Sequence, residues 1–220
     1  MLLFFQALVN PDIAFLRYAL IAGVMGSVAF GLVGSYVVAR RISSIAGAVA
    51  HSTLGGIGLG LYLQKQVGVA WFGPIPGALL FALLAAVVIG LVTLYGRQRE
   101  DTVIGAIWAV GMALGLLFLT MTPGYVEPMS YLFGNILLIS RQDLLIIVAL
   151  DLGIIALSVV FYNKFLAVCF DEEFARARGV RVGLFSMLLL CMIALTVVLM
   201  VRIVGIVMVI ALLTLPAAVA

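Results

Sequence analysis

His51 is the single histidine of the chain, and it lies in the middle of an apolar stretch over residues 42–64. Neutral imidazole is a good ligand for zinc, manganese and iron. Ionisable groups inside membrane-spanning segments commonly mark ion pathways. From its position alone, His51 could bind a transition-metal ion or form a hydrogen bond to a neighbouring helix.

Small residues surround His51 in the helical pattern. Its face of a helix carries Ser44, Gly47, Ala48, Ser52, Gly55 and Gly58. Gly56 and Gly60 form a GxxxG spacing nearby, and small residues allow helices to approach closely. The pattern predicts that Gly47, Gly55, Gly56 and Gly60 pack against other helices, so that His51 faces protein and not lipid.

Two carboxylates are further candidates. Asp151 lies near the middle of another apolar stretch, where an isolated carboxylate is costly and needs a partner or water. It could be a metal ligand, a proton carrier, or a structural acceptor for a hydroxyl group. Glu127, in the loop MTPGYVEP, could guide cations at an outer mouth, contact an external partner, or simply be solvated.

The elements that must position these residues are membrane helices. The chain is 66% hydrophobic and 10% charged, with a mean hydropathy of +1.35. A soluble domain has about 45–50% apolar and about 25% charged residues. We therefore predict one all-α, polytopic membrane domain over residues 1–220. The net charge of +3 gives no reason to expect nucleic-acid binding.

Seven stretches are long enough to span a bilayer, which requires about 20 apolar residues. They cover 18–39, 42–64, 66–99 with a helix start near Pro76, 102–126, 144–163, 182–201 and 203–220. The apolar segment 128–140 is too short to cross and is predicted to be a half-helix or re-entrant piece.

The distribution of Lys and Arg predicts the orientation. If 128–140 does not cross, eight basic residues lie on one side and four on the other. Cytoplasmic loops carry the basic excess. The N-terminus and segment 128–140 are then outside, and the loop 164–181 is cytoplasmic.

The loop 164–181 contains a second candidate site. It is a short helix whose two ends carry the capping and charged residues that favour a helix start and a helix end. Its caps and charged residues are Asp171, Glu172, Glu173, Arg176, Arg178 and Gly179. Acids in the first turn, bases in the last turn and a glycine after the end all favour a short helix. Phe170 and Phe174 give it an apolar face. Such a helix could dock into a groove on a cytoplasmic partner or lie at the lipid headgroups.

The sequence offers little for an enzyme. It contains no P-loop, no HExxH and no CxxC, and adjacent His51 and Ser52 give no nucleophile–base geometry. If ATP drives this protein, a separate chain binds and hydrolyses it.

Several motifs occur together in a fixed order. They are GLVGSYVVARRIS, AHSTLGGIGLG, SYLFGNIL, and CFDEEFARARGV followed by VGIVMVIALLTLPAAVA. In this order, and over nearly the whole chain, they resemble the permease subunits of bacterial ABC importers for manganese, zinc and iron.

The resemblance implies an architecture and partners. These are a permease homodimer, or a pair with a paralogue, in the bacterial plasma membrane, two cytoplasmic ATPase subunits and an external metal-binding protein. It implies alternating access, with the divalent metal ion as cargo and no permanently bound cofactor. It also implies that His51 lies along the metal pathway and that 171–179 is a coupling helix, with Asp171, Ala175 and Gly179 at family spacing.

The chain departs from the family in two places. Many members have an aspartate one turn before the histidine, where this chain has Gly47, so a joint Asp–His site is not available from this helix. Asp151 is the carboxylate that could act with His51 instead. The family usually has about eight spans, and we expect the C-terminus to be truncated at Ala220.

A secondary transporter or channel is the alternative. In that interpretation Asp151 and His51 form a proton or ion relay, and no ATPase is needed.

Overall fold

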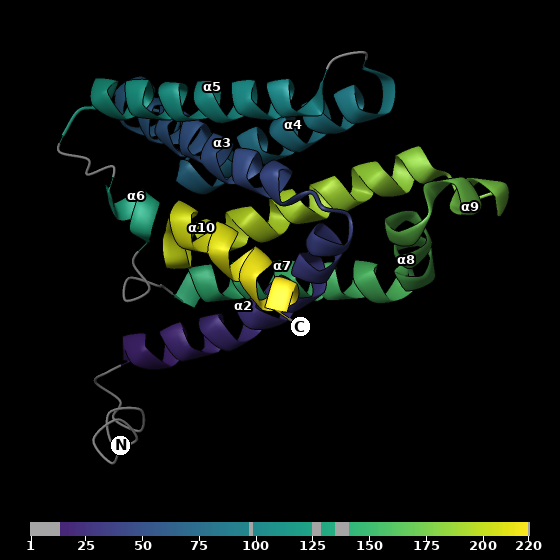
Figure 1. Ribbon diagram of the computed structural model, residues 1–220. Helices are drawn as coiled ribbons and strands as arrows, with labels where there is room; N and C mark the ends of the chain where they lie inside the picture. The colour runs from purple at the N-terminus through teal and green to yellow at the C-terminus, as the bar shows by residue number, and fades with distance from the viewer. Residues whose placement is uncertain (1–13, 97–98, 125–128, 135–140, 220) are drawn as a thin grey trace.

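The computed structural model describes residues 14–96, 99–124, 129–134 and 141–219, and this part of the chain is helical with short connections (Figure 1). The elements in chain order are α2 (Ala14–Ala39), α3 (Ser43–Tyr62), a π-helical turn (Leu63–Val67), α4 (Pro74–Tyr95), α5 (Glu100–Met121), α6 (Met129–Phe133), α7 (Arg141–Val160), α8 (Tyr162–Phe170), α9 (Glu172–Ala177) and α10 (Val182–Val219).

The predicted polytopic all-α fold is confirmed. Six helical segments in the described residues are long and apolar enough to cross a membrane: Leu16–Ala39, Ser43–Val67, Pro74–Tyr95, Glu100–Met121, Asp143–Val160 and Val182–Val201. The seventh predicted stretch corresponds to the shorter apolar helix Ile203–Val219. The third span begins at Pro74, two residues before the predicted start at Pro76, with proline in its first turn.

α10 is broken at Gly205, which adopts φ 80° and ψ 166°. The chain turns sharply there and the second half of α10 runs back across the bundle (Figure 1). This returning half packs on α2, where Gly34 lies against the backbone of Leu213. At the break, Gly205 touches the backbone of Gly134, which follows α6 and has φ 71°. Glycine tolerates both the positive φ and the close approach.

α3 is the most deeply buried span, and it packs between α4 and α5 with α10 on a further side. Gly56 lies against the backbone of Gly77 in α4, and Gly60 lies against Gly73 at the start of α4. A side chain at Gly56, Gly60 or Gly77 would overlap the facing backbone. The small residues therefore set how closely α3 and α4 approach.

A second group of helices consists of α2, α7, α8 and α10. Aromatic rings join three of them: Phe165 of α8 lies 5.5 Å from the ring of Tyr36 in α2 and 6.0 Å from that of Phe185 in α10. Phe165 is fully buried. This packing fixes α8, and with it the start of α9, to one end of the bundle.

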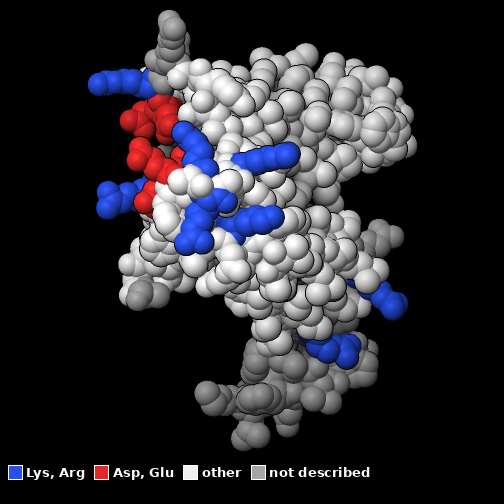
Figure 2. Space-filling model, turned by 90° about the vertical axis from the view of Figure 1, so that its right-hand side faces the viewer, with Lys and Arg blue, Asp and Glu red and all other residues white. Residues whose placement is uncertain are grey.

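Charged side chains gather at this same end. The α2–α3 corner, the end of α4 with the start of α5, and the α8–α9 segment lie there (Figure 1). Figure 2 looks onto this end and shows Lys and Arg beside Asp and Glu. Most of the basic residues counted for one side of the membrane belong to these three segments. The assignment of this end to the cytoplasm stays a prediction.

Candidate ion pathway and coupling site

His51 lies in the third turn of α3, with 9% of its surface exposed. Its imidazole stacks on the indole of Trp108 from α5, with ring centroids 4.3 Å apart and planes inclined by 20°. The buried Nδ1 atom has no hydrogen-bond partner among the described residues. A hydrogen bond from Nδ1 to a neighbouring helix, one of the two alternatives for His51, is thus not found in this part of the chain, and the ring stacks on Trp108 instead.

Trp108 also covers Gly47, one helical turn before His51. A Cβ atom on Gly47 would lie 2.8 Å from Cζ3 and 3.3 Å from Cη2 of the indole. Real Cβ contacts are not this short, so a larger residue at position 47 would displace Trp108. The ring that supports His51 therefore occupies the space that a side chain at position 47 would need.

Gly55 completes the contact of this face with the flanking helices. A Cβ atom there would lie 2.9 Å from the Phe81 ring of α4 and 3.0 Å from the Gly111 carbonyl oxygen of α5. His51 therefore lies on a helix whose neighbours approach it closely above and below the imidazole.

Asp151 lies on α7 and is fully buried, and neither carboxylate oxygen has a hydrogen-bond partner among the described residues. The buried Ser158 hydroxyl, two turns later, also lacks a partner there. α7 packs against α2, α10 and α8, whereas α3 packs mainly against α5, α4 and α10. The described helices thus form no substantial α3–α7 contact that would bring Asp151 to His51.

The donors expected of a closed metal site are not assembled in the described residues, where no group of three His, Cys, Asp or Glu side chains could hold an ion. Among the described residues, the other intramembrane candidate ligand, Asp151, lies on α7, which does not pack substantially against α3. Further ligands for an ion at His51 would be backbone oxygens, water or groups from another chain. A sparse arrangement of this kind favours release of an ion over retention.

An apolar crevice of about 260 Å³ lies between α4 and α5. Its lining residues are Ser52, Phe81, Leu84, Ala85, Val88, Ala106, Ile107, Val110 and Gly111. Ser52 supplies a hydroxyl group, but this hydroxyl already donates to the Ala48 carbonyl oxygen at 2.8 Å. The crevice is therefore not suited to conduct a metal ion.

The predicted short helix at 171–178 forms as α9. The Asp171 carboxylate accepts a hydrogen bond from the Phe174 backbone N–H at 2.9 Å, which is an N-cap. Glu172 and Glu173 occupy the first turn and Arg176 the last turn. The order of charges suits the helix macrodipole.

The end of α9 also follows the predicted pattern. Arg178 is the C-cap residue, and Gly179 follows it with φ 78°, a conformation that glycine adopts readily. Ala175 is fully buried and anchors the helix to the body of the protein.

Two aromatic side chains are exposed at this place: Phe170, the last residue of α8, and Phe174 within α9. Phe170 is 78% exposed and Phe174 is 52% exposed. The Arg178 guanidinium lies 5.0 Å from the centre of the Phe174 ring, so a cation and an aromatic face are presented together. Exposed aromatics with an adjacent arginine are typical of the centre of a protein interface.

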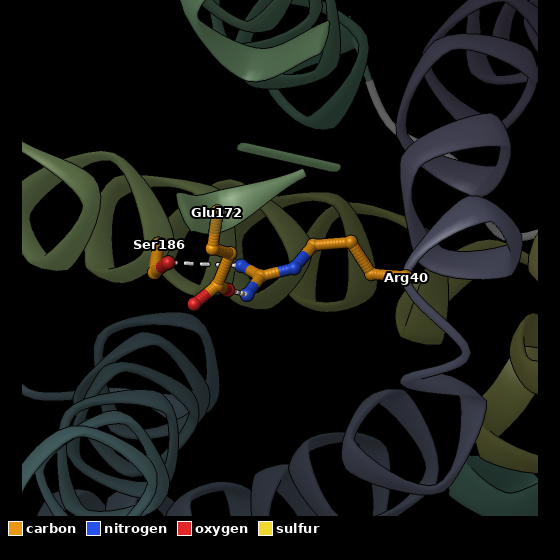
Figure 3. Close-up of polar contacts among 3 residues, drawn as sticks. All are labelled: Arg40, Glu172 and Ser186. Atoms are coloured by element: carbon orange, nitrogen blue, oxygen red, sulfur yellow. Dashed lines mark hydrogen bonds and ion pairs between the residues drawn. The ribbon is translucent and has the colours of Figure 1, made fainter. Parts of the chain in front are cut away.

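Glu172 has a partner that the sequence did not reveal. Its carboxylate forms an ion pair with the guanidinium of Arg40, which follows the last residue of α2 (Figure 3). The other terminal nitrogen of Arg40 donates to the Ser186 hydroxyl of α10 at 3.0 Å. In the sequence, the only sign of this contact is the basic pair Arg40 and Arg41 after α2, and this pair does not identify Glu172 as the partner.

Cys169 lies beside this ion pair. Burial raises the pKa of its thiol, Arg40 acts to lower that pKa and Glu172 to raise it. The charges of both Arg40 and Glu172 therefore affect the pKa of the Cys169 thiol. Glu127, the predicted residue of the outer mouth, lies outside the described residues.

Comparison with known proteins identifies a consistent set of relatives. A sequence model of the ABC 3 transport family matches residues 12–220. The chain is 44% identical over 207 residues to the uncharacterized membrane protein slr2045 of Synechocystis sp., covering 94% of this chain and 71% of that protein. It is 30% identical over 218 residues to the manganese transport system membrane protein MntC of Halalkalibacterium halodurans, covering 99% and 72%.

A solved structure has the same fold. PsaBC from Streptococcus pneumoniae, in complex with Fab, matches with a TM-score of 0.83 and 29% sequence identity, over 98% of this chain and 74% of that chain. The likeness extends over the α3–α4–α5 group and the α2–α7–α10 group alike.

Proposed function

The chain belongs to the ABC 3 transport family, and we propose that it is the membrane-spanning permease of an ATP-driven manganese importer. The family match over residues 12–220 is the observation that carries this proposal. Manganese is favoured over zinc and iron because relatives at 30–32% identity are named for manganese transport.

His51 is the residue we assign to the ion pathway. Its placement supports this role: it is an intramembrane imidazole, held by Trp108, with no hydrogen-bond partner for Nδ1 among the described residues. Mn²⁺ accepts imidazole together with oxygen ligands. With one imidazole per chain, the ion binds weakly and can be released, as conduction requires.

Gly47 limits which ligands the proposed pathway can offer to an ion near His51. Without a carboxylate one turn before His51, the other ligands of a passing ion are oxygens of water, backbone or another subunit. Asp151 is not included in the site, because α7 does not pack substantially against α3 in the described residues. The same separation gives no support to a relay between Asp151 and His51.

α9 is the element we assign to coupling with a cytoplasmic ATPase subunit. Exposed Phe174 of α9 and the neighbouring Arg178, together with exposed Phe170 at the end of α8, form a surface suited to a partner groove. Glu173 and Arg176 lie exposed on the same short helix. ATP hydrolysis takes place on that partner, and the permease converts its movement into alternating access.

The remaining parts of the assembly are proposed from the likeness to the family, from the distribution of basic residues and from the position of Glu127 in its loop. A second permease copy, or a paralogue, completes the pathway in the bacterial plasma membrane, with the N-terminus outside and α9 inside. An external metal-binding protein delivers the ion, and Glu127 guides cations at the outer mouth. No permanently bound cofactor is required.

The test is reconstitution in proteoliposomes with the candidate ATPase subunit and the external binding protein. Mn²⁺, Zn²⁺ and Fe²⁺ are offered in turn, with and without ATP, and a hydrolysis-deficient ATPase serves as the control. The proposal predicts ATP-dependent accumulation of Mn²⁺. Uptake of zinc or iron without manganese would correct the substrate. No uptake of any metal by a complex that hydrolyses ATP would reject the transport function.

A further inference from the structure

We propose that Arg40 is a positioning residue for coupling, which transmits displacement of α9 to the α2–α3 corner and so to the helix that carries His51. This inference rests on the proposed function, since it assumes that α9 is the element moved by an ATPase subunit. It adds a residue outside α9 to the coupling machinery.

Arg40, at the end of α2, joins two helices that lie far from it in sequence, α9 and α10. One terminal nitrogen pairs with Glu172 in the first turn of α9, and the other donates to the hydroxyl of Ser186 in α10 (Figure 3). The planar guanidinium can hold both partners at once, which a lysine ammonium cannot do with the same geometry.

The ion pair is sheltered on one side. The Arg40 side chain is 14% exposed and that of Glu172 is 42% exposed. Surface ion pairs are screened and contribute little. A guanidinium in a part-buried position, with its second hydrogen bond to Ser186, keeps a defined direction and is better suited to transmit a displacement.

The covalent path from Arg40 to the pathway is short. Arg40 and Arg41 form the corner between α2 and α3, and Arg41 has a positive φ of 58°. α3 begins at Ser43, and His51 lies about 12 Å further along its axis at about 1.5 Å per residue. A helix of this length moves as a unit, so a shift at its start reaches His51.

α9 has few other routes to α3. It packs against α8 and the start of α10, through residues that include the buried Ala175. The described residues give no substantial packing between α9 and α3. Arg40 therefore provides the direct polar link from the coupling helix to the corner that leads into α3.

The experiment compares metal uptake with ATP hydrolysis in the reconstituted complex. The variants are Arg40→Gln, Glu172→Gln, Ser186→Ala and the charge exchange Arg40→Glu with Glu172→Arg. The controls are Arg41→Gln, beside Arg40 in the corner, and Glu100→Gln, an exposed acid at the same end of the bundle. Copurification of the ATPase subunit is measured for each variant.

Arg40→Gln and Glu172→Gln are expected to keep the ATPase subunit bound while Mn²⁺ uptake per ATP falls by about 5- to 10-fold, at the lower end of typical coupling energies. Ser186→Ala is expected to give a smaller fall, and the charge exchange to recover part of the loss. The two controls are expected to match the wild type.

Several outcomes would overturn this role. A wild-type uptake-to-ATP ratio in both single variants, or an equal loss in Arg41→Gln, would remove it. Loss of ATPase binding with an unchanged ratio of uptake to ATP hydrolysis would mean that Arg40 contributes only to docking of the ATPase subunit. If Arg40→Gln fails to fold, the proposal is tested by the uptake-to-ATP ratio of Glu172→Gln, since the Glu172 side chain is half-exposed. A wild-type complex without ATP-dependent uptake would instead reject the proposed function.

Discussion

The imidazole of His51 lies nearly flat on the indole of Trp108, with 4.3 Å between ring centroids and 20° between planes. The same indole fills the space above Gly47, one turn earlier on α3. Trp108 of α5 therefore contacts the imidazole of His51 and also occupies the space that a side chain at position 47 would need. The character of the proposed ion site depends on a contact between two helices and not on α3 alone.

The first prediction concerns the space above Gly47. Gly47→Ala should destabilise the protein by about 1–3 kcal/mol, the usual cost of overpacking a filled site. The reason is the 2.8 Å approach between a Cβ atom and Trp108 Cζ3. Thermal unfolding in detergent measures the effect, and adding Trp108→Ala should relieve it.

Gly153→Ala is the matched control for this prediction. Gly153 lies within α7, and a Cβ atom there meets nothing within 4 Å. Alanine is favoured over glycine in a helix by about 1 kcal/mol, so this variant should be as stable as the wild type or more stable. Equal behaviour of the Gly47 and Gly153 variants would mean that Trp108 does not fill the space above Gly47.

The second prediction uses Trp108 as a reporter of metal at His51. The chain has two tryptophans, and Trp71→Phe leaves Trp108 alone. Paramagnetic Mn²⁺ bound to the stacked imidazole should quench the indole fluorescence in a saturable way, whereas Mg²⁺ should not. Fluorescence titration of the purified permease in nanodiscs measures this quenching.

His51→Gln is the control for the fluorescence titration, since glutamine retains a polar side chain and removes the imidazole ligand. It should abolish the saturable part of the quenching. Quenching of equal size and midpoint in this variant would show that the ion binds without His51.

The third prediction concerns the reactivity of Cys169. The thiolate is the form that alkylating reagents attack. Because burial raises the pKa of this thiol above its ordinary value of 9.0, alkylation should be slow at neutral pH and should accelerate as the pH rises. Labelling rates between pH 7 and 10, in a Cys191→Ala background, measure the dependence.

The neighbouring ion pair gives the sign of two further shifts at Cys169. Arg40 lowers the pKa of the thiol, so Arg40→Gln should slow labelling at a given pH. Glu172 raises the pKa, so Glu172→Gln should speed labelling. Shifts in the same direction for both variants would contradict the arrangement of Arg40, Glu172 and Cys169.

The fourth prediction concerns docking of the ATPase subunit on α9. Truncating the half-exposed aromatic ring in Phe174→Ala should weaken binding by about 1–2 kcal/mol, or roughly 5- to 30-fold in Kd. Binding of the labelled ATPase subunit to permease nanodiscs measures this affinity. Phe133→Ala, at an exposed position of α6 away from the charged end, should leave the affinity unchanged. Equal effects of the two variants would remove α9 as the docking surface.

Much of the fold was predictable because the membrane requires long apolar helices. The boundaries of the spans follow from the runs of apolar residues, and the α9 helix follows from Asp171 and Gly179 at its two ends. These are local properties, in which a residue and its near neighbours in sequence determine the structure.

The contacts between helices were not predictable from one sequence. The sequence predicts a short helix that contains Glu172, but the partner of Glu172, Arg40, lies 132 residues earlier. From the sequence, Gly47 indicates only a missing ligand, whereas the structure adds that Trp108 fills the space above it. Such pairs depend on which helices become neighbours and how they are rotated, which apolar periodicity does not determine.

The most direct test of the proposed pathway is ATP-dependent uptake of radioactive manganese by wild type and by His51→Gln in the same reconstituted complex. We predict that the wild type accumulates Mn²⁺ and that the variant loses uptake while it still binds the ATPase subunit and hydrolyses ATP. Wild-type uptake by His51→Gln would contradict the assignment of His51 to the ion pathway.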